Sequence, residues 1–416
     1  MTSRQESRER VRSGMRTWFL TPPRRHGEVV YTREVSFLEL FYDLVYVVLI
    51  AQVSHHLATH VGWRGVWEFV VVFGLIWLAW FNGTGWHELH GREDGRARNY
   101  IFTQMMLLAV LAVFAEGATG EDGPAFAITY AILFTLYTWQ WHLIHRIDDP
   151  EYRPVTTSYL AGMVTTVLVV LGSAFVSDEA RLWIWTILLV VWIGGSLVQM
   201  FRSGVIGLEE GVTGSFVERF GLFTIIVLGE VVVGVVGGIS DADELTALTL
   251  ATGIIALTIG YGLWWNYFDS LGRRIPRAGS RSFATWLFAH FPLTMAIAGG
   301  GAAMVSLVEH ASDARTPAPT AWLLVGSVVV ALAGIAMAAR SLPDGEFPPG
   351  VVRAQLPTFA VAAVAILAVG AARPSPIILV SAVSVLLALT WLRLFTLFLA
   401  QGGRLRVLEH TAIEVK

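Results

Sequence analysis

Residues 34–57 read EVSFLELFYDLVYVVLIAQVSHHL, and this stretch decides the kind of protein that the chain forms. Glu39 and Asp43 open a long apolar run, and an α-helix needs about 20 mostly apolar residues to cross a lipid bilayer. We therefore predict a membrane-spanning helix over residues 37–59. The two carboxylates are four residues apart, so they lie on nearly the same face of that helix.

The composition extends this prediction to the whole chain. Of 416 residues, 55% are hydrophobic and only 15% are charged, whereas about a quarter of the residues in a soluble protein are charged. The segments that meet the length test are residues 37–59, 63–82, 99–119, 124–144, 155–176, 181–201, 215–239, 245–268, 283–307, 319–339, 354–372 and 375–398. We therefore predict an all-α integral membrane protein with about 12 transmembrane helices.

Basic residues predict the orientation of these helices. Eight arginines occur in the first 36 residues, which read as a polar cytoplasmic arm without the apolar core of a signal peptide. Further basic residues recur in alternate turns, as they do in cytoplasmic loops. These residues are Arg92, Arg96, Arg98, Arg146, Arg153, Arg202, Arg273, Arg274, Arg277, Arg281, Arg340 and Arg353. We expect a multi-pass protein of the bacterial cytoplasmic (inner) membrane with both termini in the cytoplasm.

The two halves of the chain share short motifs. Residues 37–41 read FLELF and residues 216–220 read FVERF, while Trp-Phe-Asn at 80–82 corresponds to Trp-Trp-Asn at 264–266. An even number of helices in each half makes two parallel six-helix repeats. The predicted parts are an Arg-rich cytoplasmic arm (1–36), the first six-helix repeat (37–201), a cytoplasmic linker (202–214), the second six-helix repeat (215–400) and a cytoplasmic tail (401–416).

Polar side chains within the predicted helices are functional candidates, because placing a charge in lipid costs about 2.5–3.5 kcal/mol. Glu230 lies about 18 Å along its helix from Glu218, near the middle of the bilayer. A carboxylate there is either protonated or paired, and Arg219 and His290 are the expected partners. The candidate ion or substrate path comprises Glu39, Asp43, Asn82, Gln104, Glu218, Arg219, Glu230, Asn266, Asp269 and His290.

Each of these candidates also has a simpler explanation. Glu39 and Asp43 complement the dipole of a helix that begins beside them. Glu230 is explained equally as a neutral acid that hydrogen-bonds between helices. Asn82 and Asn266 are explained by hydrogen bonds to neighbouring helices.

Four histidines occur in two pairs with the spacing that places both imidazoles on one helix face. These are His87 with His90 and His142 with His145. A metal site in a helical bundle requires such spacing, and Glu39 lies at the same predicted membrane level. The pattern differs from the His-Glu-x-x-His of zinc proteases, and amphipathic residues gather at membrane interfaces for other reasons.

Several classes of protein are excluded. The chain has no cysteine, so it forms no disulfide and no thiolate metal site. There is no P-loop, Rossmann glycine pattern or nucleophile elbow in a suitable setting, and we expect no cofactor. We expect the lipid bilayer and a small ion or small-molecule ligand as partners, and no nucleic acid. The architecture is compatible with a homodimer.

Two long motifs resemble the signatures of the bacterial low temperature requirement protein A (LtrA) family. The first is residues 34–57 and the second is ERFGLFTIIVLGE at 218–230, and the similarity extends from about residue 30 to 400. The family is named for a cold-growth phenotype, which implies a stress response, and it has no established substrate. Phe41-Tyr42-Asp43 is also similar to the motif that opens the TMEM-type lysosomal potassium and proton channels. That likeness implies a pore beside Asp43, Phe220 and Leu222.

Three functional hypotheses follow. The first is a permease or channel for protons, small cations or a small solute, with Glu39, Asp43, Glu218 and Glu230 along its path. The second is an intramembrane enzyme that acts on a lipophilic substrate, in its metal-dependent form through the four paired histidines. The third is a membrane scaffold or stress sensor that acts through partners at its Arg-rich face.

Overall fold

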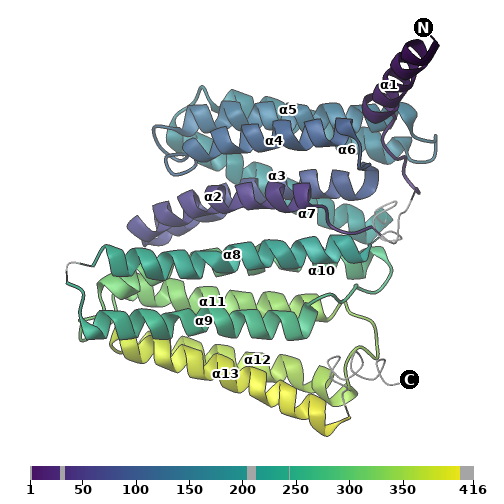
Figure 1. Ribbon diagram of the computed structural model, residues 1–416. Coiled ribbons are helices and arrows are strands. Elements are labelled where there is room, and N and C mark those ends of the chain that lie inside the picture. Colours follow the sequence, from purple (N-terminus) through teal and green to yellow (C-terminus); the bar gives the residue numbers. More distant parts are fainter. Residues whose placement is uncertain (1, 29–32, 204–211, 243, 403–416) are drawn as a thin grey trace. The chain divides into compact units, whose positions relative to one another are not determined.

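The computed structural model describes residues 2–28, 33–203, 212–242 and 244–402 (Figure 1). These residues form thirteen α-helices and no strand. The predicted all-α class is therefore confirmed. Most of the predicted linker (202–214) and nearly all of the predicted tail (401–416) lie outside the described residues.

The helices follow one another along the chain. They are α1 (Thr2–Leu20), α2 (Phe37–Thr59), α3 (Trp63–His90), α4 (Gly95–Val113), α5 (Gly123–Ile147), α6 (Arg153–Ser173), α7 (Asp178–Ser203), α8 (Gly214–Ser240), α9 (Ala247–Leu271), α10 (Ser280–Glu309), α11 (Ala318–Ala339), α12 (Pro349–Ala372) and α13 (Pro376–Ala400).

Ten of the helices in the described part of the chain are long and apolar enough to cross a membrane. They are α2, α3 and α6 to α13. Helices α4 and α5 lie where two spans are predicted but do not meet the same test. Arg96 and Arg98 open α4, and Gln140 and His142 interrupt the apolar residues of α5. The described chain is thus a multi-pass membrane protein.

Several predicted helix ends differ from the structure, with the largest differences at the ends of α3 and α4. The helix predicted to stop at residue 82 continues through Trp86 to His90. The helix predicted over 99–119 runs from Gly95 to Val113 instead. Asp94 fixes its start by accepting a hydrogen bond from the backbone N–H of Ala97 over 2.8 Å, as N-cap residues do.

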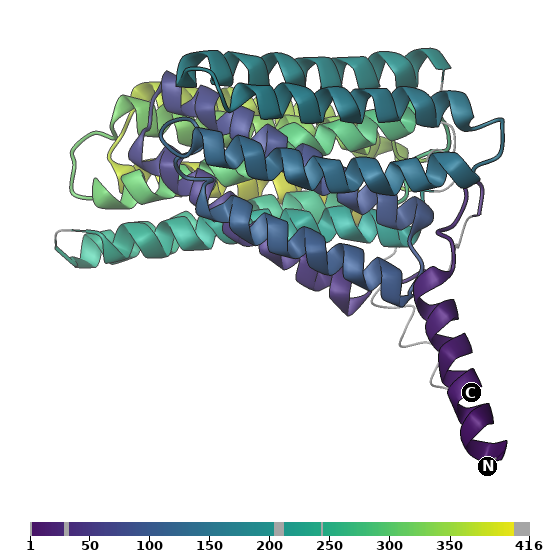
Figure 2. The ribbon, with the colours of Figure 1, turned by 90° about the horizontal axis from the view of Figure 1, so that it is seen from above.

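Part of the predicted polar arm is helical. Helix α1 alternates acidic and basic residues at spacings that stabilise a helix, such as Glu6 and Arg10, and it ends before Pro22. Figure 2 shows it projecting away from α4. Its last turn makes contact there, because the Arg98 guanidinium lies 5.1 Å from the centre of the Trp18 ring.

The chain divides into two compact units, and the division falls within α8. Unit 1 comprises residues 1–57, 63–226 and 278–281, and unit 2 comprises residues 58–62, 227–277 and 282–416. Within unit 1, α5 packs against α3, α4 and α6, and α7 packs against α3 and α6. Within unit 2, α9 packs against α11 and α13, and α12 lies between α11 and α13 (Figure 1).

Glycines allow the second part of α8 to approach α10 closely within unit 2. A Cβ atom at Gly301 would lie 2.7 Å from the backbone carbonyl of Glu230, and one at Gly234 would lie 2.1 Å from the carbonyl oxygen of Gly301. Small residues at membrane helix interfaces permit such contact between backbones. Gly301 therefore lies where the backbones of α8 and α10 come closest.

We expect Gly301→Ala to lower the free energy of unfolding by about 1–3 kcal/mol, the usual cost of an overpacked interior. Gly300→Ala is the control, because its new methyl group would meet only Ser327 Cβ at an ordinary 3.6 Å. Thermal unfolding of the two purified variants in detergent measures the difference. Equal midpoints for the two variants would contradict the close packing of α8 on α10.

Candidate functional site: a buried charge network

Opposite charges from α2 and α8 meet inside unit 1. The Arg219 side chain has no exposed surface, and Asp43 is 1% exposed. Arg219 Nη2 donates to Asp43 Oδ1 over 2.7 Å, and Arg219 Nε donates to Asp43 Oδ2 over 3.4 Å. Two-point contacts of this kind are among the strongest that arginine makes with a carboxylate. The pair joins the two sequence motifs, residues 34–57 and residues 218–230.

The ion pairs continue beyond Arg219. Its Nη1 atom lies 3.5 Å from Glu39 Oε1, and Arg33 Nη2 donates to the same oxygen of Glu39. Arg33 Nη1 donates to Glu88 Oε2 over 2.5 Å. The order is therefore Asp43, Arg219, Glu39, Arg33, Glu88, with the sign of charge alternating at each step. We call these five residues the charge network.

Neutral donors complete the hydrogen bonding of the three carboxylates. They are Trp80 Nε1 to Asp43 Oδ1 over 2.9 Å, Ser36 N and Oγ to Glu39 Oε2 over 3.0 and 3.1 Å, the Thr213 hydroxyl to Glu88 Oε1, and Ser215 Oγ to Glu88 Oε1 and Oε2 over 3.2 and 3.1 Å. Every oxygen of the three carboxylates thus has a partner. Buried charges persist only when they are paired and hydrogen-bonded in this way.

Aromatic side chains lie around Asp43 and Arg219, at one end of the charge network. The Tyr42 ring centre lies 5.7 Å from the Arg219 guanidinium carbon, and Trp80 stacks on Phe223 with ring centres 4.2 Å apart. The Tyr42 hydroxyl is 3.1 Å from the hydroxyl of Tyr46. These rings limit the access of water, and charges interact more strongly in such a low-dielectric setting.

The remaining predicted path residues of unit 1 lie apart from the ion pairs. Gln104 Nε2 donates to Gln140 Oε1 over 3.0 Å. Asn82 accepts a hydrogen bond from the Tyr159 hydroxyl. Glu218 is exposed, although it precedes Arg219 in the chain. Of the ten predicted path residues, the charge network brings together Glu39, Asp43 and Arg219.

Four predicted path residues lie in unit 2. Glu230 is buried against Gly301, and Asp269 is exposed and accepts a hydrogen bond from Trp391 Nε1 over 2.5 Å. His290 is buried, with Nε2 3.0 Å from the Tyr267 hydroxyl and Nδ1 2.7 Å from the carbonyl oxygen of Trp286. Asn266 Nδ2 donates to the carbonyl of Gly262 over 2.8 Å. Their role in a path stays a prediction.

The four paired histidines have separate surroundings. His90 Nδ1 donates to the carbonyl of Arg24 over 2.8 Å, and His145 Nδ1 is 3.1 Å from the Thr156 hydroxyl. His87 is buried and His142 is exposed. Across the described ranges, no group of three or more histidine, cysteine or carboxylate side chains is arranged to hold a metal ion.

Arg33 and Glu88 lie outside the predicted spans, so the sequence analysis does not select them. The signal that identifies Glu88 is the apolar character of Trp86 and Leu89, which continues α3 to His90. No comparable signal marks Arg33, because it is one of eight arginines in the first 36 residues.

The segment that follows α1 is attached to the ends of α3 and α5. Arg24 donates from Nη2 to the carbonyl of Glu88 over 2.6 Å and from Nε to the carbonyl of Gly91 over 2.8 Å. A cation in this position satisfies the free carbonyls at a helix C-terminus. His26 Nδ1 lies 2.6 Å from Asp148 Oδ2. Burial raises the pKa of Asp148, but its contacts with His26 outweigh burial and leave that pKa below its usual value.

A polytopic bundle of apolar helices with ion pairs buried inside it defines an α-helical integral membrane protein with a polar interior. The sequence profile of the bacterial low temperature requirement A protein (LtrA) family matches residues 34–391. The chain belongs to this family. Both motifs that meet at the Arg219–Asp43 pair lie within the matched residues.

One curated relative is an uncharacterized protein of Rhizobium meliloti (strain 1021). It is 27% identical over 287 residues, which cover 62% of this chain and 66% of the relative. The chain thus spans just under two thirds of the length of this relative. No solved structure matches the chain significantly.

A double-mutant cycle tests the ion pair between α2 and α8. Arg219→Met is expected to lower the free energy of unfolding by about 3–5 kcal/mol, because it leaves the buried Asp43 carboxylate without its cation. Adding Asp43→Asn restores part of that loss, with a coupling of about 0.5–3 kcal/mol. Thermal unfolding in detergent measures both single variants and the double variant. Strictly additive losses would show that the two side chains do not interact.

The lowered pKa of Asp148 predicts a dependence on pH. Because folding favours the carboxylate form, Asp148 contributes stability above its ordinary pKa of about 3.9 and loses that contribution as pH falls through the lowered value. Asp148→Asn is therefore expected to be less stable than the native protein at neutral pH, and the two converge in acid. Thermal unfolding across pH measures this, with exposed Asp149→Asn as the control. A deficit that does not change with pH would refute the assignment.

Proposed function

We propose that this LtrA-family protein is a permease or channel for protons, small cations or a small solute, and that the charge network is part of its path. The observation that carries the proposal is the alternating run of ionisable side chains at one end of α2, α3 and α8. Ionisable residues in membrane helices are costly, and they typically mark ion pathways, substrate sites or proton relays.

The charge network has two distinct states, one with Asp43 ionised and one with Asp43 protonated. With all partners in place, each buried charge is compensated. If Asp43 is neutralised by a proton, Arg219 loses its closest carboxylate and the ion pair with α8 weakens. Transitions that move whole elements depend on such discrete rearrangements of salt bridges. The charge network therefore suits a gate that responds to a proton or to an approaching ion.

The finer architecture belongs to the same proposal. Twelve spans form two parallel six-helix repeats, with both termini on the cytoplasmic side of the bacterial inner membrane. Supports for this are the motifs shared by the two halves, the alternation of basic turns, and the position of α4 and α5 at the third and fourth predicted spans. In this topology Glu39, in the first turn of α2, lies at the cytoplasmic end of the path. The family description is the only support for a role during growth in the cold.

Flux measurements in proteoliposomes test the function. We expect the native protein to carry protons, potassium or a small solute, and we expect Asp43→Asn and Arg219→Gln to reduce that flux about tenfold or more, equivalent to about 1.4 kcal/mol. Glu34→Gln is the matched control, because Glu34 is an exposed carboxylate five residues before Glu39. Glu230→Gln tests the second predicted carboxylate in the same assay. A native protein that carries none of the tested species overturns the proposal.

A further inference from the structure

Helix α1 is attached to unit 1 at its C-terminal end and is exposed along the rest of its length. Every residue from 5 to 18 is exposed. The last turn packs closely on the start of α4, because a Cβ atom at Gly95 would lie 2.4 Å from the Trp18 ring. The chain just beyond α1 is fixed by Arg92, whose Nε donates to the carbonyl of Pro22 over 2.9 Å.

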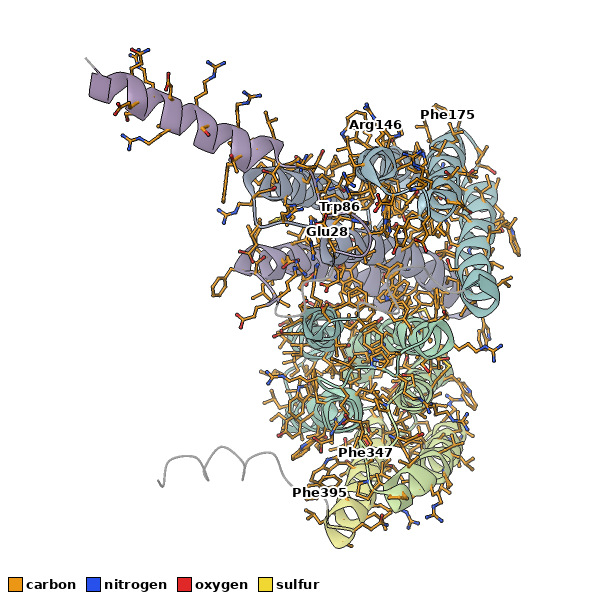
Figure 3. The ribbon with its side chains drawn as sticks, turned by 90° about the vertical axis from the view of Figure 1, so that its right-hand side faces the viewer. Glu28, Trp86, Arg146, Phe175, Phe347 and Phe395 are labelled. Carbon is orange, nitrogen blue, oxygen red and sulfur yellow. The ribbon has the colours of Figure 1, made fainter. Side chains whose placement is uncertain are left out.

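The attachment places α1 at one end of a membrane span. Helix α3 is long and apolar enough to cross a membrane and ends at His90, and a short turn connects it with α4. Figure 2 shows α1 leaving the bundle sideways, at an angle to α4 and α5. In Figure 3 it is seen side on, with side chains extending from both sides. A helix that leaves the end of a span sideways can lie along the membrane surface.

One face of α1 carries apolar side chains. Val11, Met15 and Trp18 are four and three residues apart, so they lie on the same side of the helix. They are 62%, 55% and 40% exposed. A Cβ atom at Gly14, three residues after Val11, would meet nothing within 4 Å. Because Trp18 is also the residue that contacts Gly95, this face is turned toward the bundle where α1 is attached, and its outer part is left uncovered by the described residues.

The charged side chains of α1 are arranged around this face by sign. Arg8 and Arg12 lie seven and three residues before Met15, so both neighbour it on the helix surface. Glu6 lies nine residues before Met15, which is two and a half turns and places it on the opposite side. The three charged residues are all exposed. A negatively charged surface in contact with the apolar face would therefore meet arginines, with the acid directed away from it.

We propose that α1 docks on the surface of the bilayer, with Val11 and Met15 in the headgroup region and Arg8 and Arg12 on the phosphates of anionic phospholipids. The docking goes beyond the proposed transport and does not depend on it. Interfacial helices with basic and aromatic residues insert their apolar face about 5–10 Å into the boundary between headgroups and acyl chains. Basic segments next to a span are attracted by anionic lipids, and guanidinium groups bind phosphate through paired N–H donors.

Lipid is the occupant that the attachment of α1 favours. Helices in proteins are stabilised mainly by packing of an amphipathic face, and Gly14 lowers the intrinsic helix propensity of α1. Contacts among the described residues cover mainly the last turn, so Val11 and Met15 need a further surface. The spans of the same chain hold α1 beside the bilayer, which gives lipid a high effective concentration at this face.

Spin labelling of the full chain in nanodiscs tests the docking. The chain has no cysteine, so Met15→Cys and Ser13→Cys each provide one labelling site. Ser13 is exposed and lies on roughly the opposite side of α1. In nanodiscs that contain phosphatidylglycerol, we expect the label at position 15 to be several-fold less accessible to a water-soluble nickel complex, and more accessible to oxygen, than the label at position 13. Equal accessibility at the two positions overturns the docking.

The charge of the lipid and of α1 tests the role of the arginines. We expect the protection of position 15 from nickel to fall several-fold in nanodiscs of phosphatidylcholine alone. With phosphatidylglycerol present, we expect Arg8→Gln to reduce the protection more than Arg10→Gln does. Each substitution removes one positive charge, but Arg10 lies well away from the apolar face. Equal protection in the two lipids, or equal losses in the two arginine variants, overturns the recognition of anionic lipid by this face.

Discussion

The pairing of Arg219 with Asp43 is the constraint on which the interior of unit 1 depends. A guanidinium with no access to water is tolerable only beside carboxylates, so the start of α8 must lie against the start of α2. Glu39 and Arg33 extend the same requirement to the segment before α2, and Glu88 extends it to α3. Two cations, Arg219 and Arg33, thus connect the starts of α2 and α8 with the end of α3.

Apolar side chains also contact the buried charges. Trp80 contributes a flat ring that stacks on Phe223 and an N–H group that reaches Asp43, so a single side chain joins the hydrophobic interior to the charged one. The hydroxyls of Thr213, just before α8, and Ser215, in its first turn, donate to Glu88. Because each carboxylate is shared between a cation and a neutral donor, a change at one position is transmitted to its neighbours.

Much of the fold is predictable from hydropathy, because lipid demands long apolar helices whatever their function. The predicted spans all coincide with helices. The predicted helix ends are wrong where local side chains set them, as at Asp94 and His90. The site is less predictable. Asp43 and Arg219 are visible as charges in apolar runs, whereas Glu88 lies past an apparent helix end. Arg33 is indistinguishable from neighbouring arginines, because which of them turns inward depends on tertiary contacts.

Arg24 links the segment after α1 to the end of α3. Its guanidinium holds the main-chain carbonyl of Glu88, while the side chain of the same glutamate binds Arg33. A force on α1 therefore reaches the last turn of α3 directly, and from there it loads the bond between Glu88 and Arg33. Glu88 thus connects the segment after α1, through its main chain, to the charge network, through its side chain.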